Sequence, residues 1–389
     1  MTDLRYGWLP ERHLAVAATL SHADEIIGQI VDMLVGYQSQ PDGIIGLSQV
    51  LAGTSTRATV SRVAPLPLKL PLLVADALVA LRAALEHVLF AEVEYRDGTP
   101  LGSRAARLVE MPAAYTYENF EEWLRKRAGY GPPSLKAGSE LVTRIKDLQP
   151  YQLNKDPQRH PLARLVGHTN HAKHRTPAVT AVRLATMYRE DETPPRSLRD
   201  LPRLPETPIR VGDIIAETPL GEKVPMVLLP TIGINRPGTD RWPILIDELD
   251  QIAHWVRTQA VPRLVTGADP LPPPLPARYD IAVAHDDERA AIASGSWTTA
   301  AARMKARVGA ASVRADMPTV VAQMHEELTA ESVEAWFATV PDDVLVARMQ
   351  QFQRTDTFDL DVMLRNVAVL ESFRDDALAF VRDGNASSS

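Results

Sequence analysis

The sequence contains no cysteine, and this absence excludes whole classes of site. Without thiols the chain can form no disulfide, no thiolate metal site, no iron–sulfur ligation and no cysteine nucleophile. Long apolar runs are also missing, because no stretch approaches the roughly 18 uninterrupted apolar residues of a membrane-spanning helix. The opening residues, MTDLRYGWLPERH, have no apolar core after their charges. We therefore expect no secretory signal and a cytoplasmic protein with no membrane partner.

The signatures of several enzyme classes are absent as well. The sequence has no GxGxxG after a strand, no GxxxxGK[ST], no GxSxG and no HExxH, so the phosphate-binding loops of nucleotide-binding folds and the common hydrolase elements are not indicated. Acidic residues outnumber basic ones, and the formal net charge of −7 argues against polyanion binding over the whole surface. Any contact with nucleic acid must be local.

Helical periodicity is the strongest structural signal that the sequence does contain. Apolar residues recur at alternating spacings of three and four in two segments, which predict helices over 12–37 and 71–94 that pack side by side. The segment between them, 41–68, has no such period, and we expect a loop with one edge strand there.

The middle of the chain has a residue pattern that is typical of β-strands. AVTAVRLATMY, PIRVGDIIAE and KVPMVLLPTIGI are β-rich, and a turn at 219–223 is expected to join the last two as a hairpin. A further helix is predicted over 242–261. The expected fold class is therefore mainly α (α+β), a helical bundle with a small antiparallel sheet.

Proline suggests where the domains divide. The run DPLPPPLP ends at residue 276 and predicts a polyproline spacer. We expect a helical domain with the small sheet at 1–266, a Pro-rich linker at 267–276, a C-terminal α-helical domain at 277–384 and a disordered tail at 385–389.

Individual residues of the C-terminal domain also lead to predictions. Thr329 is expected to cap a helix, Pro318 to begin one and Gly384 to end the last. Trp297 and Trp336 are expected in its core, because large aromatic side chains at helical positions are usually buried.

The clearest local anomaly is the stretch from Pro157 to Arg189, which contains no Asp or Glu although the protein is acidic. It holds four of the ten histidines, and on a helix His168, His171 and His174 fall within one arc of about 120°. Such a cationic ridge suits phosphate binding or the stabilisation of an anionic transition state.

Three interpretations of this stretch compete. A zinc site would lack a fourth ligand and a second shell, since no cysteine or acid lies nearby. A polar helix end would point its cations into water or pair them with acids from elsewhere in the chain. Contact with a phosphodiester would use histidine as acid or base and Lys or Arg to hold the phosphate.

A second candidate pair, Arg82 and His87, lies on the second long helix. A spacing of five rotates the two side chains about 140° apart, so they do not meet on an ideal helix. One interpretation pairs Arg82 with Glu86 at the surface and leaves His87 in solvent. The other requires a second helix, or a second subunit, to complete a site.

Three segments carry a resemblance to a known group of proteins. LLVADALVALRAALEHVLFAEVE resembles the segment "GDALHNLRSALDHL" of a large group of bacterial, mostly actinobacterial, proteins of uncharacterised function. LQPY at 148–151 and NHAKHR at 170–175 resemble that group's "LQPY" and "NxDKHR", with Ala172 where the motif has Asp. The resemblance covers residues 12–190 and does not extend to 270–389.

The two long helices and the Arg-x4-His pattern also resemble the HEPN superfamily. This resemblance implies a HEPN-like helical bundle and a homodimeric, metal-independent endoribonuclease without cofactors, acting in phage defence or as a toxin. It assigns catalysis to Arg82 and His87, completed across a two-fold interface. Ala83 departs from the polar residue that HEPN nucleases favour after the arginine.

The resulting hypothesis is an RNA-cleaving or RNA-binding protein. Its catalytic residues would be Arg82, His87 and His174, with a histidine activating the ribose 2′-OH and cations neutralising the phosphate. The remaining residues expected to contact nucleic acid are Asn170, Lys173, Arg175, Arg164, His168 and His171.

Two alternatives remain open at this point. In the first, the protein is a non-catalytic helical scaffold, NHAKHR is a structural helix terminus, and the C-terminal helices dock a protein partner. In the second, a small molecule binds between the helices and the sheet. Burial of His174 and Arg175 against backbone carbonyls would favour the scaffold. Their exposure in an open basic groove near Arg82 or His87 would favour the nuclease.

Overall fold

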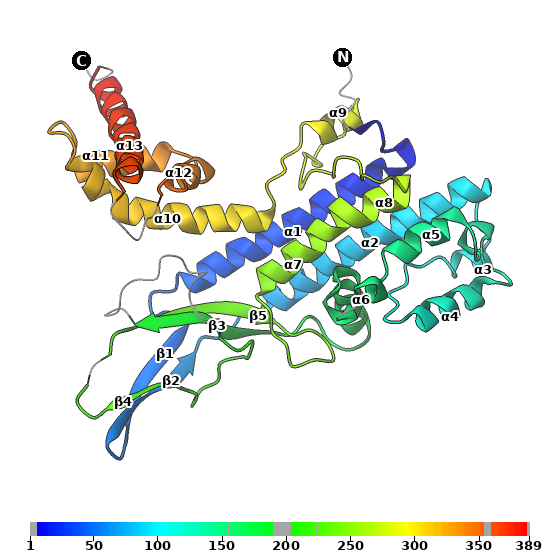
Figure 1. The fold of residues 1–389 in the computed structure, drawn as a ribbon, viewed down its shortest axis with the longest axis horizontal. Helices are drawn as coiled ribbons and strands as arrows, with labels where there is room; N and C mark the ends of the chain where they lie inside the picture. Colours follow the sequence, from blue (N-terminus) through cyan, green and yellow to red (C-terminus); the bar gives the residue numbers. More distant parts are fainter. Residues whose placement is uncertain (1–5, 154–155, 190–203, 223, 354–358, 387–389) are drawn as a thin grey trace. The chain divides into compact units, whose positions relative to one another are not determined.

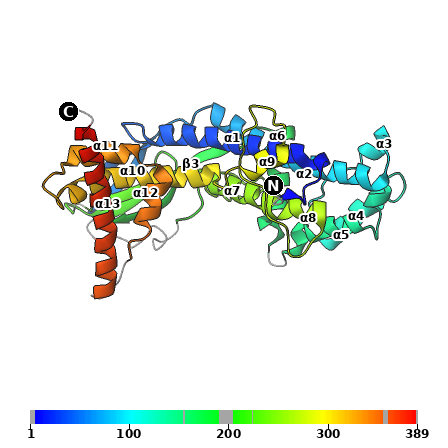
Figure 2. The same ribbon diagram turned by 90° about the horizontal axis from the view of Figure 1, so that it is seen from above.

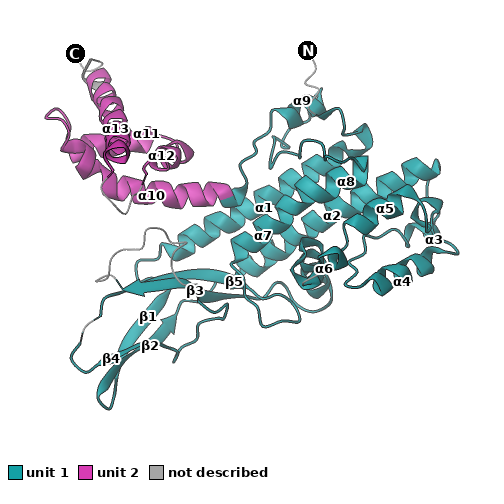
Figure 3. Ribbon diagram, viewed as in Figure 1, with its two compact units in different colours: residues 1–301 teal, residues 302–389 magenta. Residues whose placement is uncertain are grey.

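A computed structural model describes residues 6–153, 156–189, 204–222, 224–353 and 359–386. The fold is mainly helical α+β, with two small antiparallel sheets (Figure 1). The chain divides into two compact units, residues 1–301 and 302–389 (Figure 3). Within the described ranges, no helix combines the length and apolar character that crossing a membrane requires.

The first unit contains most of the helices and all the strands that the described residues form. In chain order they are α1 (Leu14–Gln38), β1 (Ile45–Ala52), β2 (Ser55–Val63), α2 (Lys69–Asp97), α3 (Ser103–Ala106), α4 (Tyr117–Arg127), α5 (Glu140–Asp147), α6 (Pro161–His174), β3 (Thr180–Arg189), β4 (Ile214–Pro219), β5 (Met226–Ile234), α7 (Leu245–Trp255), α8 (Val261–Thr266) and α9 (Glu288–Ala293).

The two long predicted helices are confirmed as α1 and α2, which lie side by side (Figures 1 and 2). Their apolar stripes form the core of the unit, and Leu20, Ile30, Leu78 and Leu85 are at most 2% exposed. Each such side chain stabilises the fold by about 1.5–3 kcal/mol relative to an exposed one. This rigid pair is the support on which α6 and α7 pack.

The strands pair differently from the prediction. β1 and β2 form a hairpin that turns at Gly53, whose positive φ of 63° suits glycine, and β4 adds to the free side of β2. β3 pairs with β5 in a second sheet. The prediction of a single edge strand in 41–68 is therefore wrong. The predicted hairpin at 219–223 is also wrong, because β4 and β5 belong to different sheets.

The first unit extends beyond the proline run at which the sequence places its end. The chain after that run returns to α1, where the Tyr279 amide donates to Ser21 Oγ at 3.0 Å and the Ala300 amide donates to Asp24 Oδ1 at 2.8 Å. These bonds attach the segment to the first unit. The division consequently falls after Ala301.

The helix predicted over 242–261 is interrupted by a π-helical turn. α7 ends at Trp255, the turn covers Val256–Ala260, and α8 continues from Val261. Arg144 Nη1 caps the end of α8 by donating to the carbonyl oxygens of Leu264 and Val265 at 2.8 and 2.7 Å.

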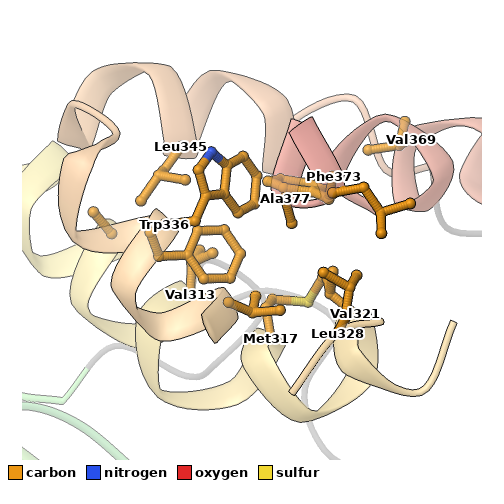
Figure 4. Packing of buried hydrophobic residues seen from close by; sticks show 13 residues of the cluster. Val313, Met317, Val321, Leu328, Trp336, Leu345, Val369, Phe373 and Ala377 are labelled. Carbon is orange, nitrogen blue, oxygen red and sulfur yellow. The ribbon is translucent and has the colours of Figure 1, made fainter. Parts of the chain in front are cut away.

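The second unit is a small bundle with its own core (Figure 4). Trp336, Phe337 and Phe373 form an aromatic cluster with ring centroids 4.8–6.1 Å apart. Its helices are α10 (Ala300–Ala322), which starts just before the division, α11 (Ala330–Thr339), α12 (Asp342–Met349) and α13 (Leu360–Ala386).

Some predictions for this region hold and others do not. Thr329 caps α11 in a capping box with Ser332, as expected. Pro318 lies inside α10 instead of beginning a helix, and α13 runs past Gly384. Trp297 is 47% exposed and belongs to the first unit. The last tail residues, 387–389, lie outside the described residues.

Candidate anion-binding site

A cavity of about 290 Å³ opens in the first unit beside α6. Four segments line it: the residue Tyr115 before α4, the turn 156–159, one face of α6, and the connection 236–241 between β5 and α7. α6 starts at this cavity because Pro161 is pre-organised for a first helical turn and His160 Nδ1 accepts the Leu162 amide at 3.2 Å.

The floor of the cavity is built around a buried carboxylate, Glu248 of α7, which is 1% exposed. Arg164 Nη1 donates to Glu248 Oε2 at 2.7 Å, and Arg236 donates to both carboxylate oxygens at 3.0 and 2.7 Å. His168 Nε2 lies 3.5 Å from Glu248 Oε1. One carboxylate thus fixes two guanidinium groups and an imidazole that line the same cavity.

The charges of the floor stabilise one another. Burial by itself would raise the pKa of Glu248, but contact with His168 and Arg236 and the charge of Arg164 hold that pKa well below its usual range. Burial lowers the pKa of Arg164, and the charge of Glu248 opposes this effect. Glu248 is therefore a carboxylate at neutral pH.

The rim is more exposed and carries two further cations. Arg159 pairs with Asp156 at 2.9 Å and is 63% exposed, and Arg241 pairs with Glu206 at 3.3 Å and is 41% exposed. Asp156 is the one carboxylate among the described residues that line the cavity, against four arginines. The cavity therefore presents guanidinium donors from floor to rim.

The face of α6 that lines the cavity continues with polar side chains towards the end of the helix. Arg164, His168 and His171 are spaced four and three residues apart and share that face. His171 is half-buried and its Nε2 lies 3.2 Å from Thr176 Oγ1. Further along the chain the side chains are exposed: Asn170, Lys173, His174 and Arg175.

The exposure of His174 and Arg175 bears on the open alternatives. Their side chains are not the buried, carbonyl-bonded groups that a purely structural helix terminus would need. The acid-free stretch is neutralised from elsewhere, since the acid that meets Arg164 and His168 comes from α7. The ridge is thus two surfaces, a buried part around Glu248 and an exposed part at the end of α6.

The second predicted pair sits apart from the cavity lining. Arg82 Nε donates to Glu86 Oε1 at 2.5 Å and Arg82 Nη2 donates to the Met111 carbonyl at 3.1 Å, while Glu86 Oε2 accepts the Met111 amide at 2.9 Å. The interpretation of Arg82 and Glu86 as an ion pair is confirmed. His87 is exposed. Within the described residues, no hydrogen bond or ion pair joins Arg82, His87 and His174 to one another.

Sequence reasoning missed three important groups of the cavity: Glu248, Arg236 and Arg241. Glu248 did leave a signal, because it lies beside Leu249 and four residues before Ile252 on the buried stripe of its helix. An acid on a buried face calls for a cationic partner. The arginines of 236–241 lie in a loop, where no periodicity indicates their direction.

No group of three or more His, Asp or Glu side chains suited to hold a metal occurs among the described residues. No family model, curated protein or solved structure matches the chain.

Proposed function

We propose that this protein binds RNA through the cavity beside α6 and the exposed cations at the end of that helix. The observation that carries the proposal is the cavity with four arginines, two of them held in place by Glu248. Guanidinium groups bind phosphate oxygens bidentately, and groups that are already fixed lose little entropy when a ligand arrives.

The local character of this surface fits an acidic protein. The formal charge of −7 disfavours long-range attraction of a polyanion. Lys173 and Arg175, exposed at the end of α6, supply positive charge near the cavity-lining face of the same helix. RNA contact at such a site depends on direct phosphate neutralisation and therefore on salt.

Cleavage is the further step of this proposal. A histidine, His87 or His174, would take the proton of a ribose 2′-OH, whose oxygen then bonds to phosphorus while the 5′-oxygen leaves and takes up a proton. The products are a 2′,3′-cyclic phosphate and a 5′-hydroxyl. Because no hydrogen bond or ion pair joins Arg82, His87 and His174 within the described residues, a second subunit of a HEPN-like homodimer would complete this site. A cytoplasmic role in phage defence or as a toxin belongs to the same proposal.

The binding step is tested by fluorescence anisotropy with a short labelled single-stranded RNA at several salt concentrations. The double variant Lys173→Glu with Arg175→Glu should bind more weakly, and its dependence of log affinity on log salt should be shallower by about 1.4, roughly 0.7 for each lost phosphate contact. Arg125→Glu with Lys136→Glu, two exposed cations outside the cavity lining, is the charge-matched control. Equal affinities for the double variant and the control would overturn the proposal.

The cleavage step needs a separate measurement. RNA incubated with excess wild-type protein should be degraded, and His87→Ala and His174→Ala should each prevent this without changing the circular dichroism of the chain. Both side chains are exposed, so their removal should not unfold the protein. RNA that stays intact with wild-type protein rejects cleavage and leaves binding to be decided by the anisotropy measurement.

One observation favours the scaffold alternative. On α13, Leu360, Met363, Leu364 and Val367 are 40–54% exposed and follow helical spacing, so they form an apolar stripe on the second unit. We propose that, if the protein acts as a scaffold, this stripe contacts a protein partner. Leu364→Glu should then abolish co-purification of such a partner from cells while RNA binding is unaffected.

A further inference from the structure

We infer that the cavity beside α6 is a pocket for a terminal phosphate, carried either by the end of an RNA chain or by a free nucleotide. This inference rests on the proposed function for its RNA source and names the part of the RNA that is recognised. It differs from backbone binding, in which any internal phosphate would serve.

The burial of the arginines at the floor of the cavity supports a terminal phosphate as the ligand. The exposed fraction of the arginine side chains falls from 63% at Arg159 and 41% at Arg241 to 14% at Arg236 and 5% at Arg164. An internal phosphodiester has a chain on both sides and can reach the rim. A terminal phosphate has a single substituent, so it can be lowered to the floor.

The floor also has unused hydrogen-bonding capacity. Within the described residues, the buried Nε of Arg164 has no hydrogen-bond partner, while the Nε2 of His168 faces Glu248 Oε1 at 3.5 Å. Both residues line the cavity, and their side chains are at most 5% exposed. A buried donor without a partner destabilises the unliganded protein, and a bound phosphate oxygen would supply the missing acceptor.

The size of the cavity limits the ligand to about one nucleotide. Its volume of about 290 Å³ lies just below the roughly 300–1,000 Å³ that small-molecule pockets span. Tyr115 lines the cavity and is 41% exposed, so its ring can stack with a base. Gln158 adds a polar side chain for a sugar.

A glycine makes the pocket testable without disturbing Glu248. Gly167 of α6 lines the cavity, and a Cβ added there would meet nothing within 4 Å. A leucine at this position should occupy part of the cavity and is compatible with the helix. Gly36 in α1 has the same open surroundings, is exposed and lies outside the cavity lining, so Gly36→Leu is the matched control.

The experiment compares the affinity of the protein for one RNA sequence that carries a 5′-phosphate, a 3′-phosphate or hydroxyl groups at both ends. The binding of AMP and of inorganic phosphate is measured by calorimetry. One of the phosphorylated RNAs should bind at least about tenfold more tightly than the hydroxyl-ended RNA. Gly167→Leu and Arg241→Ala should remove this preference, and Gly36→Leu should keep it. The double variant Lys173→Glu with Arg175→Glu should bind all three RNAs more weakly, with the affinity reduced by the same factor for each.

The outcomes separate the inference from the proposed function. If the wild-type protein binds all three RNAs equally, the terminal-phosphate pocket is rejected and RNA binding stands. If no RNA binds but AMP binds and Gly167→Leu prevents it, the pocket is supported with a free nucleotide as its ligand, and RNA binding is rejected. If neither RNA, AMP nor inorganic phosphate binds, both are rejected.

Discussion

The first unit contains two buried glutamates in nearly the same chemical setting, Glu92 on α2 and Glu248 on α7. Each is 1% exposed at its side chain and each contacts two arginines and one histidine. Around Glu92, His13 is completely buried, and Arg12 lies over the ring of Tyr95. Around Glu248, the cations line a cavity. A buried glutamate with two arginines and a histidine can therefore join helices, or it can hold hydrogen-bond donors in place for a ligand where a cavity lies beside it.

The two clusters also have a common electrostatic logic. Burial would raise the pKa of Glu92, but hydrogen bonds from His13 and Arg12 lower it to about 2. Glu248 is shifted in the same direction. The two clusters should therefore contribute similarly to stability. They should differ in their response to a ligand and to mild acid.

The largest expected effect is common to both clusters. Glu92→Ala and Glu248→Ala each leave buried cations without a carboxylate, which typically costs about 3–5 kcal/mol in the free energy of unfolding. Urea denaturation followed by circular dichroism measures the loss. Glu121→Ala, at an exposed position of α4, is the control and should change stability by less than about 0.5 kcal/mol. Losses under 1 kcal/mol at both buried sites would contradict this account.

The next effect should separate the clusters. With AMP at about a hundred times its dissociation constant, the wild-type protein should gain about 2.7 kcal/mol of stability. Glu248→Gln should lose this gain because Arg164 and Arg236 are no longer held, whereas Glu92→Gln should retain it. Thermal denaturation of each variant with and without AMP gives the comparison. An equal gain in both variants would break the proposed difference between the clusters.

As the pH falls, stability should be lost first through His160, at the start of α6 beside the cavity, and later through Glu92. Burial, together with the charge of Arg164, lowers the pKa of His160 to about 4 from 6.5. The unfolded chain takes up this proton below about pH 6.5 and the folded chain does not, so stability is lost between pH 6.5 and 4. Glu92 contributes stability that is present above pH 4.5 and lost only as the pH falls towards 2.

His160→Asn tests this order. An asparagine can still accept the Leu162 amide as a helix cap, but it does not titrate. The variant should lose less stability between pH 6.5 and 4 than wild type, by an amount of the order of 2 kcal/mol, in urea denaturation series across this range. An unchanged pH dependence would show that His160 is not the responsible group.

The smallest effect on stability is expected at the exposed end of α6. Lys173→Glu with Arg175→Glu should lower the free energy of unfolding by no more than about 1 kcal/mol, since neither side chain is buried and only the dipole of α6 favours cations there. The same variant should weaken RNA binding clearly. A large loss of stability would instead indicate that these cations belong to the folded framework.

Helical periodicity explains why α1 and α2 could be predicted from the sequence. Their buried positions repeat every three or four residues, so the signal is local and does not depend on any partner. Helix caps are also local, and Thr329 accepts the Ser332 amide as its sequence position predicts. These features need only a few consecutive residues.

Strand pairing and the cavity could not be predicted in the same way. β4 pairs with β2, although more than 150 residues separate Thr56 from its partner Thr218, and a β-rich pattern does not state which strand it joins. Glu248 and Arg164 are likewise distant in sequence. The cationic stretch could be found from the sequence, but the carboxylate that organises it came from another helix.

The π-helical turn at Val256–Ala260 has a consequence for how one helix can make two kinds of contact. A π turn bonds i to i+5 and so contains about one residue more than an α-helical turn, which changes the helical phase by about 100°. Glu248 lies before this change and Leu264 after it. Removing one residue from the turn should rotate α8 relative to α7, withdraw the Leu264 carbonyl from Arg144, and leave the contact between Glu248 and Arg164 in place. The extra residue thus rotates α8 relative to α7, so that Glu248 can contact Arg164 at the cavity while the end of α8 contacts Arg144.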